Sequence, residues 1–186
     1  GTFGSGYFQT SVSSAGDVNG DGFDDVIMGV NGADLNGSGS GSSYVVFGKA
    51  AGFGATMDLS SLDGTNGFRL DGEEIKDGLG ISVNTAGDVN GDGLDDLIVG
   101  APGTAEGGTK VGVAYVLFGK KSGFAADINL SELNGNNGFR ISGLTEGDYL
   151  ANGVSAGDIN GDGLSDVIVT SYGANNPHGA NAGFTY

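Results

Sequence analysis

The stretch AGDVNGDGFDDVIMG, residues 15–29, places acidic or amide side chains at alternate positions and then becomes an apolar run. Nearly the same stretch returns as AGDVNGDGLDDLIVG at residues 86–100 and as AGDINGDGLSDVIVT at residues 156–170. Its first aspartate recurs after 71 residues and again after 70, as Asp17, Asp88 and Asp158. An internal repeat of this length indicates a repeat architecture, so the period decides the fold class.

The repeat extends well beyond the acidic stretch. YVVFGKAAGF (residues 44–53) matches YVLFGKKSGF (residues 115–124), and LSSLDGTNGFRLDG (residues 59–72) matches LSELNGNNGFRISG (residues 130–143). Each repeat contains four short apolar runs bounded by Gly, Asn, Asp or Ser, which is typical of strands. In the second repeat these runs are residues 79–85, 96–100, 112–119 and 138–142. Residues 57–64 could hold one helical turn.

Four short strands per repeat predict an all-β fold made of β-propeller blades, each with four antiparallel strands. A β-solenoid is the alternative, but its coils are usually shorter than this period. We expect blade 1 at about residues 7–76, blade 2 at about 77–146 and an incomplete blade 3 at about 147–186. Residues 183–186 align with residues 112–115, so the sequence is expected to stop within the third strand of the third blade. A closed ring then needs further blades from a longer parent chain or from other copies; otherwise the array is open.

Composition excludes several classes of partner. The chain has 186 residues, with 23 acidic against 7 basic residues and a formal net charge of −16. This charge argues against nucleic acid and anionic membrane surfaces as partners, because both repel an acidic chain. No apolar run reaches the roughly 18 residues that a membrane-spanning helix needs, so no membrane insertion is expected. The absence of cysteine excludes disulfides and thiolate metal sites.

The acidic loops have the pattern of a binding site for a hard cation. Ca²⁺ takes six to eight oxygen ligands, and side chains at positions 1, 3 and 5 converge when the backbone curls around the ion. Glycine at position 6 permits the sharp turn, the carbonyl of position 7 points inward, and the aspartate at position 9 completes the ligands. The predicted Ca²⁺ ligands, one set per repeat, are Asp17, Asn19, Asp21, Phe23 and Asp25; Asp88, Asn90, Asp92, Leu94 and Asp96; and Asp158, Asn160, Asp162, Leu164 and Asp166.

Two alternatives compete with three calcium sites. An EF-hand needs a glutamate at position 12 and flanking helices, but position 12 is Met28, Val99 or Val169, each within an apolar run. A polar turn explains Asn-Gly or Asp-Gly, but not the packing of several carboxylates that would repel one another without a cation. Mg²⁺ fits less well than Ca²⁺ because it prefers to keep several waters in a rigid octahedron. Position 8 changes from aspartate to Ser165 in the third loop, so Asp24 and Asp95 are expected not to be ligands.

These motifs resemble the FG-GAP repeats of the integrin α-subunit β-propeller and its bacterial relatives. The matching residues are the three acidic loops, the Phe-Gly pairs at Phe47 and Phe118, and Gly-Ala-Pro at residues 100–102. The first and third repeats depart from Gly-Ala-Pro, with Gly-Val-Asn at residues 29–31 and Thr-Ser-Tyr at residues 170–172. The close likeness between the repeats is more similar to bacterial secreted or surface proteins than to animal integrins. The resemblance implies a seven-bladed ring in full members, calcium between the first two strands of a blade, and ligand recognition on the opposite face.

That opposite face would be built by the loops that differ between repeats, at residues 31–40, 103–110, 172–181, 71–78 and 143–149. A protein or glycan ligand could bind there, which favours adhesion or ligand binding by an extracellular or cell-surface protein. The loops could equally differ because nothing constrains their sequence. The alternatives are a non-catalytic propeller part of a larger secreted enzyme and a structural spacer. No catalytic function is expected, because eleven of the 23 acidic residues lie in the three loops and the single histidine, His178, lies in a Gly/Asn-rich loop. Arg69 and Arg140 recur in Asn-Gly-Phe-Arg, which predicts a structural role such as a contact to the neighbouring blade.

Overall fold

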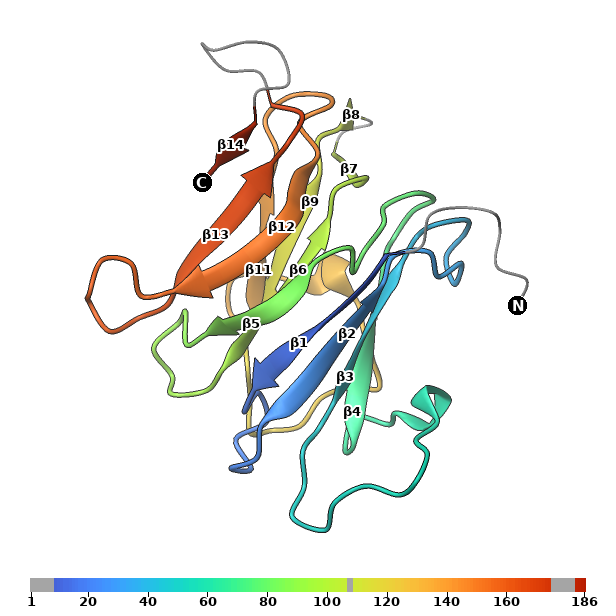
Figure 1. The fold of residues 1–186 in the computed structure, drawn as a ribbon, viewed down its shortest axis with the longest axis vertical. Helices are drawn as coiled ribbons and strands as arrows, with labels where there is room; N and C mark the ends of the chain where they lie inside the picture. The colour runs from blue at the N-terminus through green and yellow to red at the C-terminus, as the bar shows by residue number, and fades with distance from the viewer. Residues whose placement is uncertain (1–8, 107–108, 175–182) are drawn as a thin grey trace.

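Antiparallel sheets follow one another along the chain in the computed structural model, which describes residues 9–106, 109–174 and 183–186 (Figure 1). Sheet 1 has the order β1 (Thr10–Gly16), β2 (Asp25–Val30), β3 (Ser42–Val46) and β4 (Gly67–Asp71). Sheet 2 has the order β5 (Val83–Gly87), β6 (Asp96–Ala101), β9 (Val113–Leu117) and β11 (Gly138–Ser142). Sheet 3 contains β12 (Leu150–Gly157), β13 (Asp166–Ser171) and β14 (Phe184–Thr185). The predicted all-β fold, with two four-stranded blades and a partial third, is confirmed.

The remaining elements are short. A small hairpin of β7 (Ala105–Glu106) and β8 (Thr109–Lys110) lies between β6 and β9. Single 3₁₀ turns form at η1 (Leu59–Ser61) and η2 (Leu130–Glu132), so the helical turn predicted within residues 57–64 is confirmed. The described residues contain no helix with the length and apolar character needed to span a bilayer.

The first strand of the second repeat is the one element whose position was predicted wrongly. The apolar run at residues 79–85 predicted a strand there, but β5 begins at Val83 and continues to Gly87. Gly78 and Gly80 have φ values of +66° and +86°, which turn the chain away from an extended course. Leu79 is instead fully buried beside sheet 1, where its N–H donates to the carbonyl of Ser40 at 3.0 Å.

The hydrophobic core lies between the sheets, because successive side chains of a strand point to opposite faces. Along β6, Leu97 and Val99 pack in the layer shared with sheet 1, while Ile98 packs in the layer shared with sheet 3. Every residue of β6 is buried, as expected for a strand covered on both faces. The sheets therefore stabilise one another, and none of them has a core of its own.

A strap from the second repeat, residues 123–128, crosses over the outer edge of sheet 1. Its β10 (Asp127–Ile128) pairs in parallel with β4, opposite Arg69 and Leu70. Phe124 stacks on Phe68 with ring centroids 4.4 Å apart, and it also lies 5.7 Å from Phe47. The sequence did not predict this strap, because its contacts are made with another repeat.

Arg69 ties the strap to sheet 1. Its guanidinium lies 2.9 Å from Asp127 of the strap and 2.8 Å from Asp71 of its own strand. The prediction that this arginine contacts the neighbouring blade is confirmed. The side chain is partly exposed, so the pair fixes the position of the strap more than it stabilises the fold.

The loops of each sheet fall on two opposite edges of the molecule. Figure 1 shows the β1–β2, β5–β6 and β12–β13 turns along one edge, and the β2–β3 and β6–β9 connections along the other. On the second edge the loops that differ between repeats are joined by backbone hydrogen bonds. Lys76 donates to Ser38 at 3.0 Å, and Gly103 donates to Asp77 at 2.9 Å. The predicted ligand-binding loops thus form one continuous surface, as far as the described residues go.

Candidate metal centres

Each acidic loop occupies the turn between the first two strands of its sheet. Residues 17–25 join β1 to β2, residues 88–96 join β5 to β6, and residues 158–166 join β12 to β13. The placement predicted from the sequence is correct for all three loops. A bulge precedes the turn in the first two repeats, where the strand register shifts between Ser14 and Gly16 and between Thr85 and Gly87.

The carboxylate of position 1 is the centre around which each loop curls. In the first loop, Asp17 accepts N–H bonds from Asp21 at 3.0 Å and from Gly22 at 2.9 Å. The corresponding glycines of the other loops, Gly93 and Gly163, donate to Asp88 at 2.9 Å and to Asp158 at 3.0 Å. The same backbone path is therefore formed three times around an acidic side chain.

Positions 3 and 5 continue the same pattern. Asn19 accepts the N–H of Asp21 at 2.9 Å, and Asp21 accepts the N–H of Phe23 at 2.9 Å. These bonds recur in the second loop at Asn90 and Asp92, and in the third loop at Asn160 and Asp162. The oxygen donors of positions 1, 3 and 5 thus face the inside of the turn.

Position 9 differs from the others in the first two loops, because its carboxylate is buried there. Asp25 is 1 % exposed and accepts the N–H groups of Val18 at 3.1 Å and Gly48 at 2.8 Å. Asp96 is equally buried and accepts from Val89 and Gly119, both at 2.9 Å. Each aspartate therefore links its loop to the end of the third strand of its own sheet.

This link explains the glycine of the Phe-Gly motif. A Cβ on Gly48 would lie 2.4 Å from the carbonyl oxygen of Asp24, and a Cβ on Gly119 would lie 2.5 Å from that of Asp95. Only glycine brings its N–H close enough to the buried carboxylate. The sequence identified the motif but not this role.

Burial disfavours the charged form of these two carboxylates. Desolvation, with a smaller contribution from the charges of Asp21 and Asp17, raises the pKa of Asp25 to about 6 in spite of the N–H bonds from Gly48 and Val18. Desolvation likewise raises the pKa of Asp96 to about 6, with a further contribution from Asp92 and Asp88. A cation placed among the carboxylates of either loop would relieve this repulsion.

The donor chemistry of the loops fits a hard cation. Each loop offers carboxylate and amide oxygens, the ligands that Ca²⁺ prefers. In the part of the chain that the structure describes, no three His, Cys, Asp or Glu side chains are grouped so that they could hold a metal ion by themselves. A cation in a loop would therefore also need the asparagine and carbonyl oxygens. An oxygen that accepts one backbone N–H keeps a second lone pair for such a cation.

Comparison with known proteins assigns the chain to a family. The model of the FG-GAP repeat matches residues 8–46, 80–117 and 151–186, which together make up more than half of the chain. The chain belongs to the FG-GAP repeat family. Each matched segment begins near the first strand of a sheet, includes one acidic loop and ends in the third strand. The acidic loops therefore lie within the part of each repeat that the family model describes.

Two types of relative share these FG-GAP repeats. The chain is 30% identical to the phosphatidylinositol-glycan-specific phospholipase D of Dictyostelium discoideum over 95% of its length, and 31% identical to that of Bos taurus over 89%. It is 33% identical to integrin alpha-7 of Rattus norvegicus over 54% of its length. The chain spans only 18% of the two phospholipases and 8% of the integrin.

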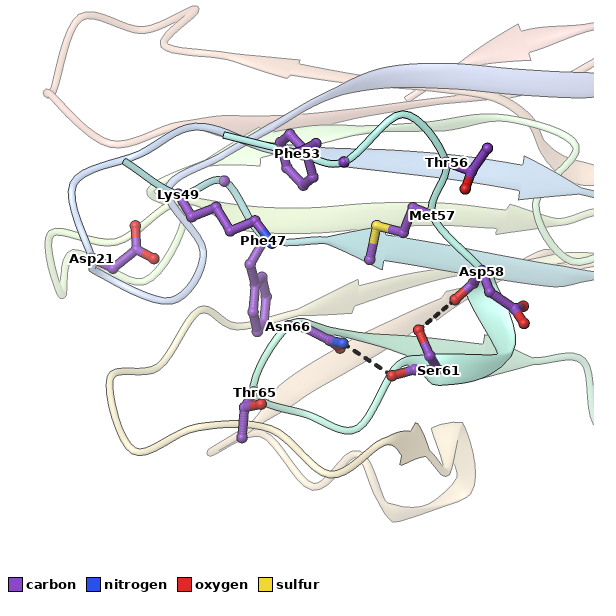
Figure 2. A pocket seen from close by; sticks show the side chains of 12 residues that line it. Asp21, Phe47, Lys49, Phe53, Thr56, Met57, Asp58, Ser61, Thr65 and Asn66 are labelled. Carbon is purple, nitrogen blue, oxygen red and sulfur yellow. Dashed lines mark hydrogen bonds between the residues drawn. The ribbon is translucent and has the colours of Figure 1, made fainter. Parts of the chain in front are cut away.

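A cavity of about 350 Å³ lies beside the first acidic loop of the FG-GAP array (Figure 2). Asp21 lies at one end, and the connection from β3 to β4 forms the other walls with Phe53, Met57 and Asn66. Lys49 stands over the Phe53 ring at 5.0 Å from its centroid. The equivalent cavity of the second repeat is about 170 Å³. In that repeat the counterpart of Phe53 is Phe124, which is packed into the core instead.

Proposed function

We propose that the chain is a calcium-binding FG-GAP propeller segment of a secreted or cell-surface protein. The observation that supports it is the threefold recurrence of one hydrogen-bonded loop around the same oxygen donors, at residues 17–25, 88–96 and 158–166. The side chains at positions 1, 3, 5 and 9 and the carbonyl at position 7 would hold one Ca²⁺ in each loop. When bound, calcium supplies positive charge, and three ions would change the formal net charge from −16 to −10.

Calcium titration of the chelator-stripped chain tests this proposal directly. We expect about three ions per chain, with the affinity of about 10⁻⁴–10⁻³ M that is typical of extracellular modules. Mg²⁺ at the same concentration should compete poorly. The variant Asp24→Ser is the control, because Asp24 is an exposed acidic residue outside the predicted ligand set. A titration that shows no heat and no bound calcium contradicts the proposal.

The calcium affinity expected for the three loops favours a protein that is exported from the cell. Sites of this strength fill at the millimolar calcium of extracellular fluid and stay empty in cytosol. We therefore propose an extracellular or cell-surface location for the segment. In its parent protein, the predicted repeats at residues 7–76, 77–146 and 147–186 would serve as consecutive blades beside further blades.

We further propose that the edge opposite the acidic loops binds a protein or glycan ligand. Large apolar side chains are exposed there, among them Leu35, Ile75 and Leu144 at 53%, 58% and 83%. Tyr149 and Tyr172 add a stacked pair with rings 5.2 Å apart. Where such side chains form a contiguous patch, they mark interaction sites. Part of the predicted loops, residues 107–108 and 175–181 with His178, lies outside the described residues.

Screening against matrix proteins and glycans tests the proposed ligand-binding edge. The double variant Leu35→Ser/Ile75→Ser should lose the ligand without a change in melting temperature, because both side chains are largely exposed. The control variant Asp24→Ser changes the edge that carries the acidic loops, so it should still bind the ligand. Absence of any ligand would favour a structural spacer.

A second candidate function is a non-catalytic part of a larger secreted enzyme. It is favoured by the two phospholipase D relatives, which align with 95% and 89% of the chain, whereas the integrin aligns with 54%. This candidate predicts that the isolated chain hydrolyses no phosphatidylinositol-glycan and that the parent protein does. An adhesion protein would show hydrolysis in neither form.

A further inference from the structure

The repeat that follows an acidic loop holds that loop in place. Asp95, at position 8 of the second loop, lies against the start of the first loop. Its carboxylate accepts the N–H of Asp17 at 2.8 Å, and its own N–H points to the Asp17 carbonyl at 3.4 Å. One residue of repeat 2 thus binds both backbone polar groups of the first predicted calcium ligand of repeat 1.

The close approach requires glycine on the side of the first loop. A Cβ on Gly16 would lie 2.3 Å from the Asp95 carboxyl carbon, and Gly16 has a φ of +69°. The aliphatic carbons of Lys121 cover Gly20 in the same way. Among the described residues, Lys121 forms no ion pair with a carboxylate of the first loop.

The second loop is held by the third repeat through a neutral residue. Ser165, the counterpart of Asp95, donates its N–H to the carbonyl of Asp88 at 2.9 Å. Its hydroxyl lies 2.2 Å from the point where a Cβ on Gly87 would stand. The same backbone contact therefore joins repeat 2 to the first loop and repeat 3 to the second loop. Only the contact to the first loop also includes a negatively charged side chain, that of Asp95.

We propose that Asp95 is a positioning residue for the first calcium loop, and that the first loop binds calcium more tightly than the second. The proposal rests on the calcium function proposed above. Asp95 fixes the backbone of Asp17 before the metal binds. This reduces the entropy that the first loop loses on calcium binding. Its carboxylate also adds negative charge beside the bound cation.

A calcium titration followed by NMR, with the full chain labelled with ¹⁵N-glycine, tests the proposal loop by loop. The amides of Gly22, Gly93 and Gly163 each donate to the first carboxylate of their own loop, so each reports on one loop. In the wild type, the midpoint should be lower at Gly22 than at Gly93. Asp95→Ser should raise the Kd measured at Gly22 by about tenfold, which is the effect of losing a charge-assisted hydrogen bond.

Two further variants separate positioning from general stability. Asp24→Ser removes the same charge from position 8 of repeat 1 and should raise the Kd at Gly22 by much less than Asp95→Ser does, because the bond to the Asp17 N–H is made by Asp95. Ser165→Asp should lower the Kd at Gly93, a gain that a merely structural role would not produce, and it remains informative if Asp95→Ser does not fold.

Each outcome of the titration distinguishes the two proposals. If Asp95→Ser and Asp24→Ser behave alike and Ser165→Asp has no effect, the positioning role is wrong and the calcium function stands. If no glycine responds to calcium in the wild type, both are wrong.

Discussion

Transfer of the chain from calcium to chelator is expected to lower its melting temperature by about 10–25 °C. A ligand that binds only the folded state stabilises it by RT ln(1 + [L]/Kd) at each site. With a Kd of about 10⁻⁴–10⁻³ M and about 10 mM free calcium, each loop contributes about 1.4–2.7 kcal/mol. Three loops together contribute about 4–8 kcal/mol, which is comparable with the whole stability of an ordinary domain.

Thermal melts in CaCl₂, in MgCl₂ of equal ionic strength and in EDTA measure this effect. Magnesium is the necessary comparison, because any salt screens the repulsion within a chain of net charge −16. The triple variant Asp21→Asn/Asp92→Asn/Asp162→Asn removes the carboxylate of position 5 from every loop. It should lose the response to calcium. Equal melting temperatures in calcium and magnesium would show that the loops are ordinary polar turns.

The substitution Phe124→Ala is expected to cost about 3–4 kcal/mol of unfolding free energy, as for other large aromatic side chains removed from a core. Phe124 is 9% exposed and packs on both Phe68 and Phe47. Its removal leaves a cavity between sheet 1 and the strap. Urea unfolding in the presence of calcium measures the loss of unfolding free energy. The dependence of that free energy on urea concentration should be unchanged, which would show that the unfolded state is the same.

The chain supplies its own matched control for this substitution. Phe53 holds the same position in the first repeat but is 55% exposed, so Phe53→Ala should cost less than about 1 kcal/mol. A second measurement follows the strap itself, because the Arg69 N–H donates to the Ala126 carbonyl at 2.8 Å. Hydrogen exchange at Arg69 should accelerate in Phe124→Ala and not in Phe53→Ala. Equal losses of stability in the two variants would mean that the strap contributes no packing energy.

The sheets could be predicted from the sequence because their signals are local and repeated. Short runs of β-branched and aromatic residues between turn residues specify strands, and the offset of 71 aligns one repeat with the next. The same alignment placed residues 183–186 beside the second strand of the third repeat. The structure pairs Phe184 with Ser171 there, as Val113 pairs with Ala101 in the second repeat.

Contacts between repeats could not be predicted in the same way. The strap contains no strand pattern of its own, and only the adjacent edge of β4 makes residues 127–128 extended. Asp95 illustrates the same limit within the candidate site. The replacement of aspartate by Ser165 indicated that position 8 is not a ligand, but no pattern within one loop shows that its side chain binds the loop before it. The hydrogen bonds that direct the carboxylates at backbone N–H groups also depend on the folded turn.

The strap has a consequence for how the protein is made. The outer strand of sheet 1 is covered by residues that leave the ribosome more than fifty positions later, since Arg69 pairs with Asp127. At roughly 5–20 residues per second, that edge stays open for about 3–12 s during translation. An open strand edge is a template for pairing with another chain. Nascent sheet 1 therefore passes through a brief aggregation-prone interval that ends only when the strap of the second repeat has been synthesised.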